Sequence, residues 1–154
     1  MDKKMLKKPL YAKAHNFLKN FNKHIKKGLS EDFEMVKDDM HIAMFRMRDA
    51  IAQAYGEDNK LMAWAAFGYA RGKTGALKAY LDILAHDGKK IRVGDAVEMR
   101  AMLDEINTEL TALMKQIKPD TDKWKEEYFE EFGEKPEDLD NIRGEDDLPP
   151  PDDR

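Results

Sequence analysis

Apolar side chains recur every three or four residues through nearly the whole span from residue 10 to residue 117. Because an α-helix turns once in about 3.6 residues, this spacing places the apolar side chains of each segment on one helical face. No segment shows the strict alternation of apolar and polar residues that is typical of a half-buried strand. The sequence therefore predicts an all-α fold whose amphipathic helices bury their apolar faces together.

Capping and breaking residues divide this span into four predicted helices. The first begins at Pro9, which is well tolerated in a first helical turn, and ends near Gly28. The second has Ser30 as its N-cap and ends at Gly56.

The third predicted helix is capped by Asp58 or Asn59 and ends at Gly88. The fourth opens with a sequence that resembles a capping box, with Asp95 as the N-cap, and Pro119 closes it. Helices of about 20 residues joined by connections of about two to eight residues favour an antiparallel up-down-up-down four-helix bundle.

Each predicted helix contributes one apolar stripe to the expected core. In chain order the stripes are Leu10, Ala14, Phe17, Phe21 and Ile25; Phe33, Val36, Met40, Met44, Met47, Ile51 and Ala54; Leu61, Trp64, Phe67 or Gly68, Arg71 or Gly72, Leu77, Tyr80 or Leu81, and Leu84; and Met99, Leu103, Ile106, Leu110, Leu113 and Ile117. The last stripe alternates spacings of four and three, which is a heptad seam of the coiled-coil kind.

The expected domain organisation has three parts: a basic N-terminal extension at residues 1–8, the bundle at residues 9–118 and an acidic tail at residues 119–154. The tail carries four aromatic residues at near-helical spacing, namely Trp124, Tyr128, Phe129 and Phe132. We predict one short helix in the tail, followed by disorder, because prolines and acidic residues dominate the rest.

Charges of opposite sign gather at the two ends of the chain. Residues 1–27 contain nine lysines and one aspartate, residues 119–154 contain fifteen acidic and five basic residues, and the overall net charge is −4. One interpretation is a basic surface for a polyanion, with an acidic tail that competes for it. The other is a pair of solvated segments that keep the protein soluble.

Several classes of protein are excluded or disfavoured. The chain contains no cysteine, which excludes disulfides, thiolate nucleophiles and cysteine-based metal sites. No apolar run approaches the roughly 18 residues that span a bilayer, and no apolar segment follows the charged N-terminus as it does in a signal peptide. We therefore expect a cytoplasmic protein with no membrane partner.

Motifs that carry catalytic or cofactor chemistry are incomplete. Residues 72–75 read Gly-Lys-Thr-Gly, but Phe67 stands where a phosphate-binding P-loop needs glycine, and no strand precedes it. Asp38 and His41 resemble half of a di-metal motif that occurs only once. Capping explains Ser30, the only serine. We expect no enzyme activity, no cofactor, no metal and no small-molecule substrate.

Two kinds of binding residue remain as candidates. Cations on the first and third predicted helices are candidates for contacting the phosphates of a nucleic acid: Lys13, Lys19, Lys23, Lys26, Lys27, Arg71, Lys73 and Lys78. Lys89, Lys90 and Arg92 add positive charge in the loop after the third helix. The third helix is apolar or small-sided more than halfway round, so its surplus face predicts self-association through Trp64, Gly68, Gly72 and Gly75.

Residues 10–118 resemble one known family of four-helix bundles. The residues that carry the likeness are the opening LYAKAHNFL; Ile51, Ala52, Gln53 and Ala54 with Tyr55 and Gly56; Ala70, Arg71 and Gly72; Leu77 and Leu81; and the closing LMKQIK. This pattern is similar to that of the family of the 23S rRNA intervening-sequence proteins and of Avd, the accessory variability determinant of diversity-generating retroelements.

The resemblance implies an antiparallel four-helix bundle that assembles as a ring-like homopentamer. For Avd-like members it also implies association with a reverse transcriptase and its RNA through basic surface, and it implies no catalytic residues. We therefore expect a non-enzymatic oligomeric binding protein of this kind. The alternative is a structural or adaptor oligomer that binds another protein through its aromatic acidic tail and binds no nucleic acid.

Overall fold

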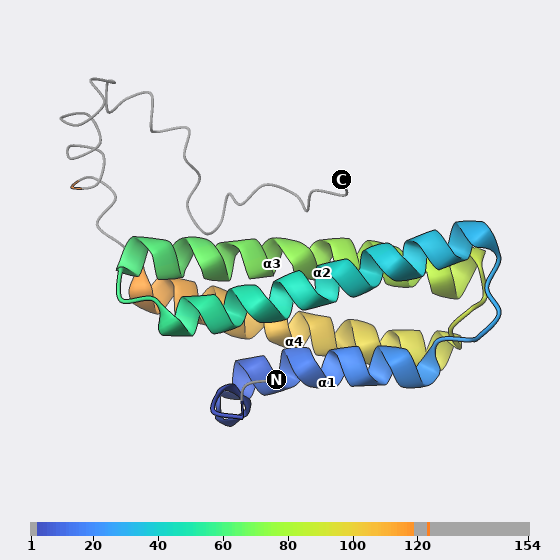
Figure 1. The fold of residues 1–154 in the computed structure, drawn as a ribbon, viewed down its shortest axis with the longest axis horizontal. Coiled ribbons are helices and arrows are strands. Elements are labelled where there is room, and N and C mark those ends of the chain that lie inside the picture. The colour runs from blue at the N-terminus through green and yellow to red at the C-terminus, as the bar shows by residue number, and fades with distance from the viewer. Residues whose placement is uncertain (1–2, 119–122, 124–154) are drawn as a thin grey trace, which may run out of the picture.

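Four long helices run antiparallel to their neighbours in the chain (Figure 1). The computed structural model describes residues 3–118 and residue 123. The elements are, in chain order, a 3₁₀ turn η1 (Met5–Lys7), α1 (Pro9–His24), α2 (Glu31–Gly56), α3 (Lys60–Asp82), a π-helical turn η2 (Ile83–Asp87) and α4 (Val93–Ile117). Nothing in the described residues is a strand. The predicted all-α, up-down-up-down four-helix bundle is confirmed.

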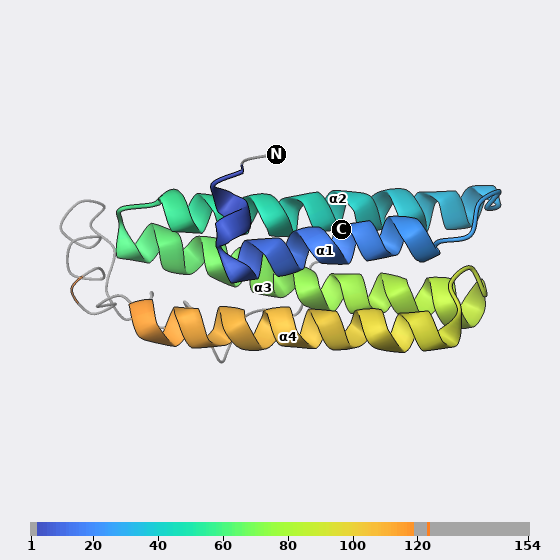
Figure 2. The same ribbon diagram turned by 90° about the horizontal axis from the view of Figure 1, so that it is seen from below.

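The order of the helices around the bundle follows their order in the chain. α2 packs along α3, α3 packs along α4, and α1 lies against both α4 and α2. Figure 2, seen from below, shows α1 in front of the other three helices, between α2 and α4. α1 therefore closes the bundle, and its apolar face completes a core that the other three helices leave open.

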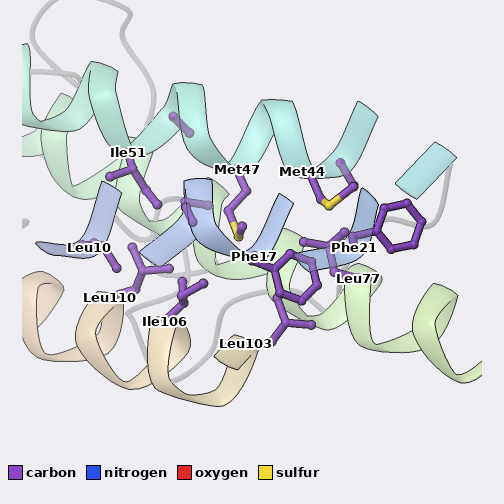
Figure 3. Close-up of a cluster of buried hydrophobic side chains, with 14 of the residues drawn as sticks. Leu10, Phe17, Phe21, Met44, Met47, Ile51, Leu77, Leu103, Ile106 and Leu110 are labelled. Carbon is purple, nitrogen blue, oxygen red and sulfur yellow. The ribbon is translucent and has the colours of Figure 1, made fainter. Parts of the chain in front are cut away.

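The core is a continuous set of apolar side chains from all four helices (Figure 3). Phe17 and Phe21 of α1 are fully buried against side chains such as Met44 and Met47 of α2. Each buried side chain of this size contributes about 1.5–3 kcal/mol relative to an exposed one. The predicted apolar stripes of the first two helices all lie in the core or pack partly buried against it.

The stripes of α3 and α4 differ from the prediction in detail. On α4, Met114 is fully buried whereas Leu113 and Ile117 are only half-buried. An α-helix has about 3.6 residues per turn, so the buried face drifts away from a strict heptad seam over 25 residues. α3 has a broader buried face than predicted, because Ala63, Ala66, Ala70 and Ala76 are also buried.

Three helix boundaries test the predicted caps. Asn59 is the N-cap of α3, and its side-chain oxygen accepts a hydrogen bond from the Met62 N–H at 3.1 Å. Ser30 occupies the N-cap position of α2, but its side chain makes no capping bond. The prediction that Asp95 caps α4 is wrong. α4 begins three residues earlier, with Arg92 at the cap, and Asp95 lies in its first turn, where a carboxylate complements the helix dipole.

The C-terminal end of α1 also differs from the prediction. The helix ends at His24 rather than near Gly28, because the backbone at Ile25 is already extended. Gly28 adopts a positive φ of 69°, which suits glycine, and so it lies in the turn that leads to α2. The four residues after His24 therefore belong to the loop, which frees Lys26 and Lys27 from the helix.

The turn from α3 to α4 is closed by two backbone hydrogen bonds. The Gly88 N–H donates to the Ile83 carbonyl at 2.9 Å, and the Lys90 N–H donates to the Leu84 carbonyl at 2.6 Å. Lys89 between them has a φ of 51°, the left-handed conformation that usually follows a helix end and usually belongs to glycine. An added Cβ on Gly88 would lie 2.6 Å from Cε1 of Phe33, so the Phe33 ring packs directly on this turn.

Replacing Gly88 with alanine tests this close approach. Gly88→Ala is expected to destabilise the fold by about 1–3 kcal/mol, because the new methyl group overlaps the Phe33 ring. Gly94→Ala is the matched control, since its Cβ meets nothing within 4 Å and lies in the first turn of α4. Urea denaturation should give a lower midpoint for Gly88→Ala and an equal or higher one for Gly94→Ala. Equal midpoints for the two variants would contradict the packing of Phe33 on Gly88.

Candidate polyanion-binding surface at the loop end

The α1–α2 loop and the α3–α4 loop lie at the same end of the bundle, on the right in Figure 1. A backbone hydrogen bond joins them: the Lys26 N–H donates to the Lys90 carbonyl at 2.9 Å. Ile91, at the end of this turn, is buried, and Ile25 packs partly buried against the core. The two loops are therefore one structural unit, although more than sixty residues separate them in the sequence.

Six cations project from this unit, and we call them the loop-end cations: Lys23, Lys26, Lys27, Lys89, Lys90 and Arg92. All except Lys90 are exposed, and Lys90 holds its Nζ 5.9 Å from the centre of the Phe33 ring. Within residues 3–118 and 123, the loop-end cations form no ion pair with a carboxylate. Their charges are therefore available to a ligand.

Four carboxylates belong to the same loops and helix ends. Glu31 and Asp32 lie in the first turn of α2, Asp87 ends η2, and Asp95 lies in the first turn of α4. Glu34, the third acidic residue in the first turn of α2, pairs with Lys37 at 3.6 Å and adds no net charge. Asp95 Oδ2 is 3.4 Å from Nδ1 of His24. Six cations against four carboxylates leave a net charge of +2 at this end, with histidine neutral. The surface is thus moderately basic.

Two of the predicted nucleic-acid-binding residues are engaged elsewhere. Lys13 lies on α1 and pairs with Glu105 of α4 at 2.7 Å and with Glu109. These hydrogen bonds hold the pKa of Lys13 above its usual range. Lys78 of α3 pairs with Asp104 of α4. Both lysines therefore neutralise carboxylates and fasten α4 to its neighbours, at a net benefit of about 0–1 kcal/mol for each exposed pair.

The remaining predicted cations do not share one face. Lys19 is exposed on α1, Arg71 is half-buried on α3, and Lys73 holds its Nζ 5.0 Å over the Tyr69 ring. The N-terminal lysines, from Lys3 to Lys8, lie at the start of α1, whose 16 residues separate them from Lys26 by about 24 Å. Of the eight predicted residues, the structure brings Lys23, Lys26 and Lys27 together.

The other half of this surface lies outside the residues that the sequence predicts to bind nucleic acid. Lys89, Lys90 and Arg92 were recognisable as charges in one loop, but nothing in their spacing relates them to Lys26. The backbone bond from Lys26 to Lys90 supplies that relation. The positive φ of Lys89 is a second feature that the sequence does not reveal.

The predicted oligomer-interface residues fall into two pairs. Trp64 and Gly68 are buried within the chain, whereas Gly72 and Gly75 are half-buried on α3. A Cβ added at Gly72 would meet nothing within 4 Å. Trp64 buries its Nε1, which has no hydrogen-bond partner among the described residues. Gly72 thus has open space above its backbone among the described residues.

The other motifs found in the sequence have structural explanations. The Gly-Lys-Thr-Gly segment lies in the middle of α3, where the Thr74 hydroxyl donates to the Arg71 carbonyl at 2.7 Å. His41 places Nε2 2.7 Å from Oδ1 of Asn22. The described residues bring no three His, Asp or Glu side chains into a group suited to a metal ion. Among those residues, no helix is both long and apolar enough to cross a membrane.

Comparison with known proteins gives no relative: neither the protein-family models, nor the curated proteins, nor the solved structures contain a match to this chain.

Two half-buried histidines predict a loss of stability in mild acid. Burial, followed by the nearby Lys19 and Arg48, lowers the pKa of His15, and burial followed by Lys37 lowers the pKa of His41. Both pKa values lie below the unfolded value of 6.5, so the unfolded chain takes up these protons first. The stabilising effect of neutral imidazoles is thus full above about pH 6.5 and declines as the pH falls through the lowered pKa values.

Urea denaturation at pH 7.5 and pH 5.5 measures this effect. A variant that combines His15→Gln with His41→Gln should lose less stability between the two pH values than the parent chain. His86→Gln, at an exposed position in η2, should behave as the parent does. If the double variant loses as much stability as the parent, the two imidazoles are not the source of the dependence.

Proposed function

We propose that this chain is a non-enzymatic oligomeric binding protein, an Avd-like accessory factor that associates with a reverse transcriptase and binds RNA through the loop-end cations. The observation that carries the proposal is the Lys26 to Lys90 hydrogen bond, which makes one basic surface from two loops. The resemblance of residues 10–118 to the Avd family supports the choice of RNA and reverse transcriptase as partners.

Exposed lysines and arginines suit contacts to a phosphate backbone. Each contact releases counterions from the nucleic acid, and the contacts carry no direct reading of base sequence. The loop-end cations keep their charge unpaired within the described part of the chain, in contrast to Lys13 and Lys78. Binding by this surface is therefore expected to be salt-dependent and tolerant of sequence.

Lys89 supports a role for this turn in binding. A non-glycine residue in the left-handed region costs on the order of 1 kcal/mol, and glycine avoids that cost. At a φ of 51°, Lys89 keeps a positive charge at a position where the backbone favours glycine. Strain that is retained at an exposed charged position is consistent with selection for binding rather than for stability.

Self-association complements a surface of modest charge. A net charge of +2 at one loop end engages few phosphates, whereas several copies in one assembly engage the same RNA with a much higher effective concentration. The outer side of α3 supports such assembly, because it combines Gly72 with exposed Ala65 and Ala79. We propose a homo-oligomer, with the pentamer of the resembled family as the expected size.

An RNA titration at several salt concentrations tests the basic surface. The variant Lys26→Ala, Lys27→Ala, Lys89→Gly should bind single-stranded RNA at least about tenfold more weakly than the parent. Its slope of log affinity against log salt should be smaller by about 2, which corresponds to about 0.7 for each lost contact. Lys89→Gly alone should weaken binding while it raises the thermal midpoint, because glycine relieves the left-handed backbone.

The matched control removes three exposed lysines from other parts of the bundle: Lys7, Lys60 and Lys115, each replaced by alanine. This control should retain nearly parental affinity. Equal losses in the control and in the loop-end variant would show that only total charge matters. No binding by the folded parent at low salt would contradict the RNA function and favour the alternative.

The alternative is a structural or adaptor oligomer that binds another protein through its aromatic acidic tail and binds no nucleic acid. The tail, residues 119–154, lies outside the described residues except for Lys123. The observation that favours this alternative is the set of four aromatic residues at near-helical spacing in that tail, Trp124, Tyr128, Phe129 and Phe132.

Substitution of Gly72 tests the oligomer. Gly72→Leu should leave the single bundle intact, because its Cβ meets open space and helix propensity improves by up to about 1 kcal/mol. A close interface at Gly72 would not admit the leucine side chain. On dilution, the variant assembly should therefore dissociate at a protein concentration about tenfold higher, or more, than the parent assembly does. Light scattering across a dilution series measures this, with Gly94→Leu as the control at another open glycine. A monomeric parent, or unchanged assembly of Gly72→Leu, would contradict the proposed interface.

A further inference from the structure

The outer sides of α2 and α3 form an apolar face. On α3, Met62 and Tyr69 are seven residues apart and so lie on one side of the helix. On α2, Met35 and Ile42 have the same spacing. All four side chains are between 48% and 62% exposed, which is unusual for large apolar residues on a bundle.

The contacts of neighbouring residues show how the two helices are oriented. The exposed apolar side of α2 is turned towards α3, and that of α3 is turned towards α2. On α2, His41 points towards α1, because its ring contacts Phe21 and Asn22. Ile42 is the next residue, so its side chain is rotated about 100° from that of His41 around the helix axis. This rotation takes it past the direction that points straight out of the bundle and onto the α3 side. On α3, Lys78 and Asp82 pair with residues of α4, so the opposite side, with Met62 and Tyr69, borders α2. The four side chains thus border the line along which α2 and α3 pack, and we call this side of the bundle the α2–α3 face.

The chain itself supplies a segment that matches this face. After Lys118 it continues for 36 residues, and Trp124, Tyr128, Phe129 and Phe132 follow one another at the spacing of one helical face. Glutamates occupy most positions between these aromatic residues, which leaves the other side of such a helix to solvent. An amphipathic segment of this kind needs an apolar surface to bind.

The position of the tether favours the α2–α3 face as that surface. α4 ends at the end of the bundle where α2 passes into α3, at the left in Figure 1. Met62 lies in the first turn of α3 and is therefore at this end. The five residues between Lys118 and Trp124 span up to about 20 Å when extended. Residues 124–132 in helical form would cover about 13 Å, close to the roughly 10 Å that separates the levels of Met62 and Tyr69.

We infer that residues 119–132 dock on the α2–α3 face of the same chain, with the aromatic residues against Met62, Tyr69 and Ile42. The short tether raises the effective concentration of the segment to the millimolar range, so a modest apolar contact suffices. Docking covers Met62, Tyr69 and Ile42 and places the acidic side of the segment outward. It does not depend on RNA binding, which involves the opposite end of the bundle.

Disulfide trapping in the full chain tests this docking. Because the chain has no cysteine, a pair of introduced cysteines contains its only thiols. The test pair is Tyr69→Cys with Tyr128→Cys, and the control pair is Ala112→Cys with Tyr128→Cys. Ala112 is exposed on α4 and lies nearer to the tether along the chain, so a segment without a docking site would trap Ala112 faster. If the segment docks, the test pair should instead form its disulfide faster than the control pair. In a glutathione redox buffer we expect the two rates to differ by about tenfold or more.

A further substitution separates docking from chance collision. Adding Trp124→Ala and Phe129→Ala to the test pair should slow its disulfide formation about tenfold or more and leave the control pair unchanged. Intact mass and non-reducing electrophoresis distinguish bonds within one chain from bonds between chains. Equal rates for the two pairs, or no effect of the aromatic substitutions, would overturn the inference. Trapping mainly between chains, lost on dilution, would also overturn it and assign the face to a second copy.

Discussion

The insertion of α1 into the groove between α2 and α4 is the constraint on which the rest of the structure depends. Phe17 and Phe21 are the largest side chains of α1 that are completely buried in the shared core. At about 1.5–3 kcal/mol each, they outweigh the exposed Lys13 pairs with α4, which contribute about 0–1 kcal/mol. Once α1 is held in this position, its C-terminal end must meet the turn between η2 and α4, and the lysines that follow α1 come to lie beside those of that turn.

Backbone interactions then convert this proximity into a defined surface. The Lys26 to Lys90 hydrogen bond joins the loops, Phe33 packs on Gly88, and the left-handed Lys89 follows the end of the π-helical turn. The positions of the positive side chains are thus set by uncharged groups, namely backbone amides and an aromatic ring. This arrangement leaves the loop-end cations without a carboxylate partner in the described part of the chain. Lys13 and Lys78, in contrast, form ion pairs with carboxylates of α4.

The helices and most of the core were predictable from the sequence because burial depends on a local period. The spacing of Phe17 and Phe21, or of Met40, Met44 and Met47, suffices to place these side chains on an inner face. Helix ends were less predictable, because several residues near an end can serve as the cap. Asn59 caps α3 as predicted, whereas Asp95 lies inside the first turn of α4. The candidate site was only half predictable: whether a lysine is free depends on carboxylates as distant in sequence as Glu109 is from Lys13.

Lysine acylation in the presence and absence of RNA tests the central claim most directly, because it measures every lysine of the intact protein at once. A basic surface built from two joined loops predicts that Lys26, Lys27 and Lys89 become protected together, at the same RNA concentration. Lys7, Lys60 and Lys115 should remain as reactive as they are without RNA. Protection of one loop without the other, or of lysines spread evenly over the bundle, would contradict a single surface at the loop end.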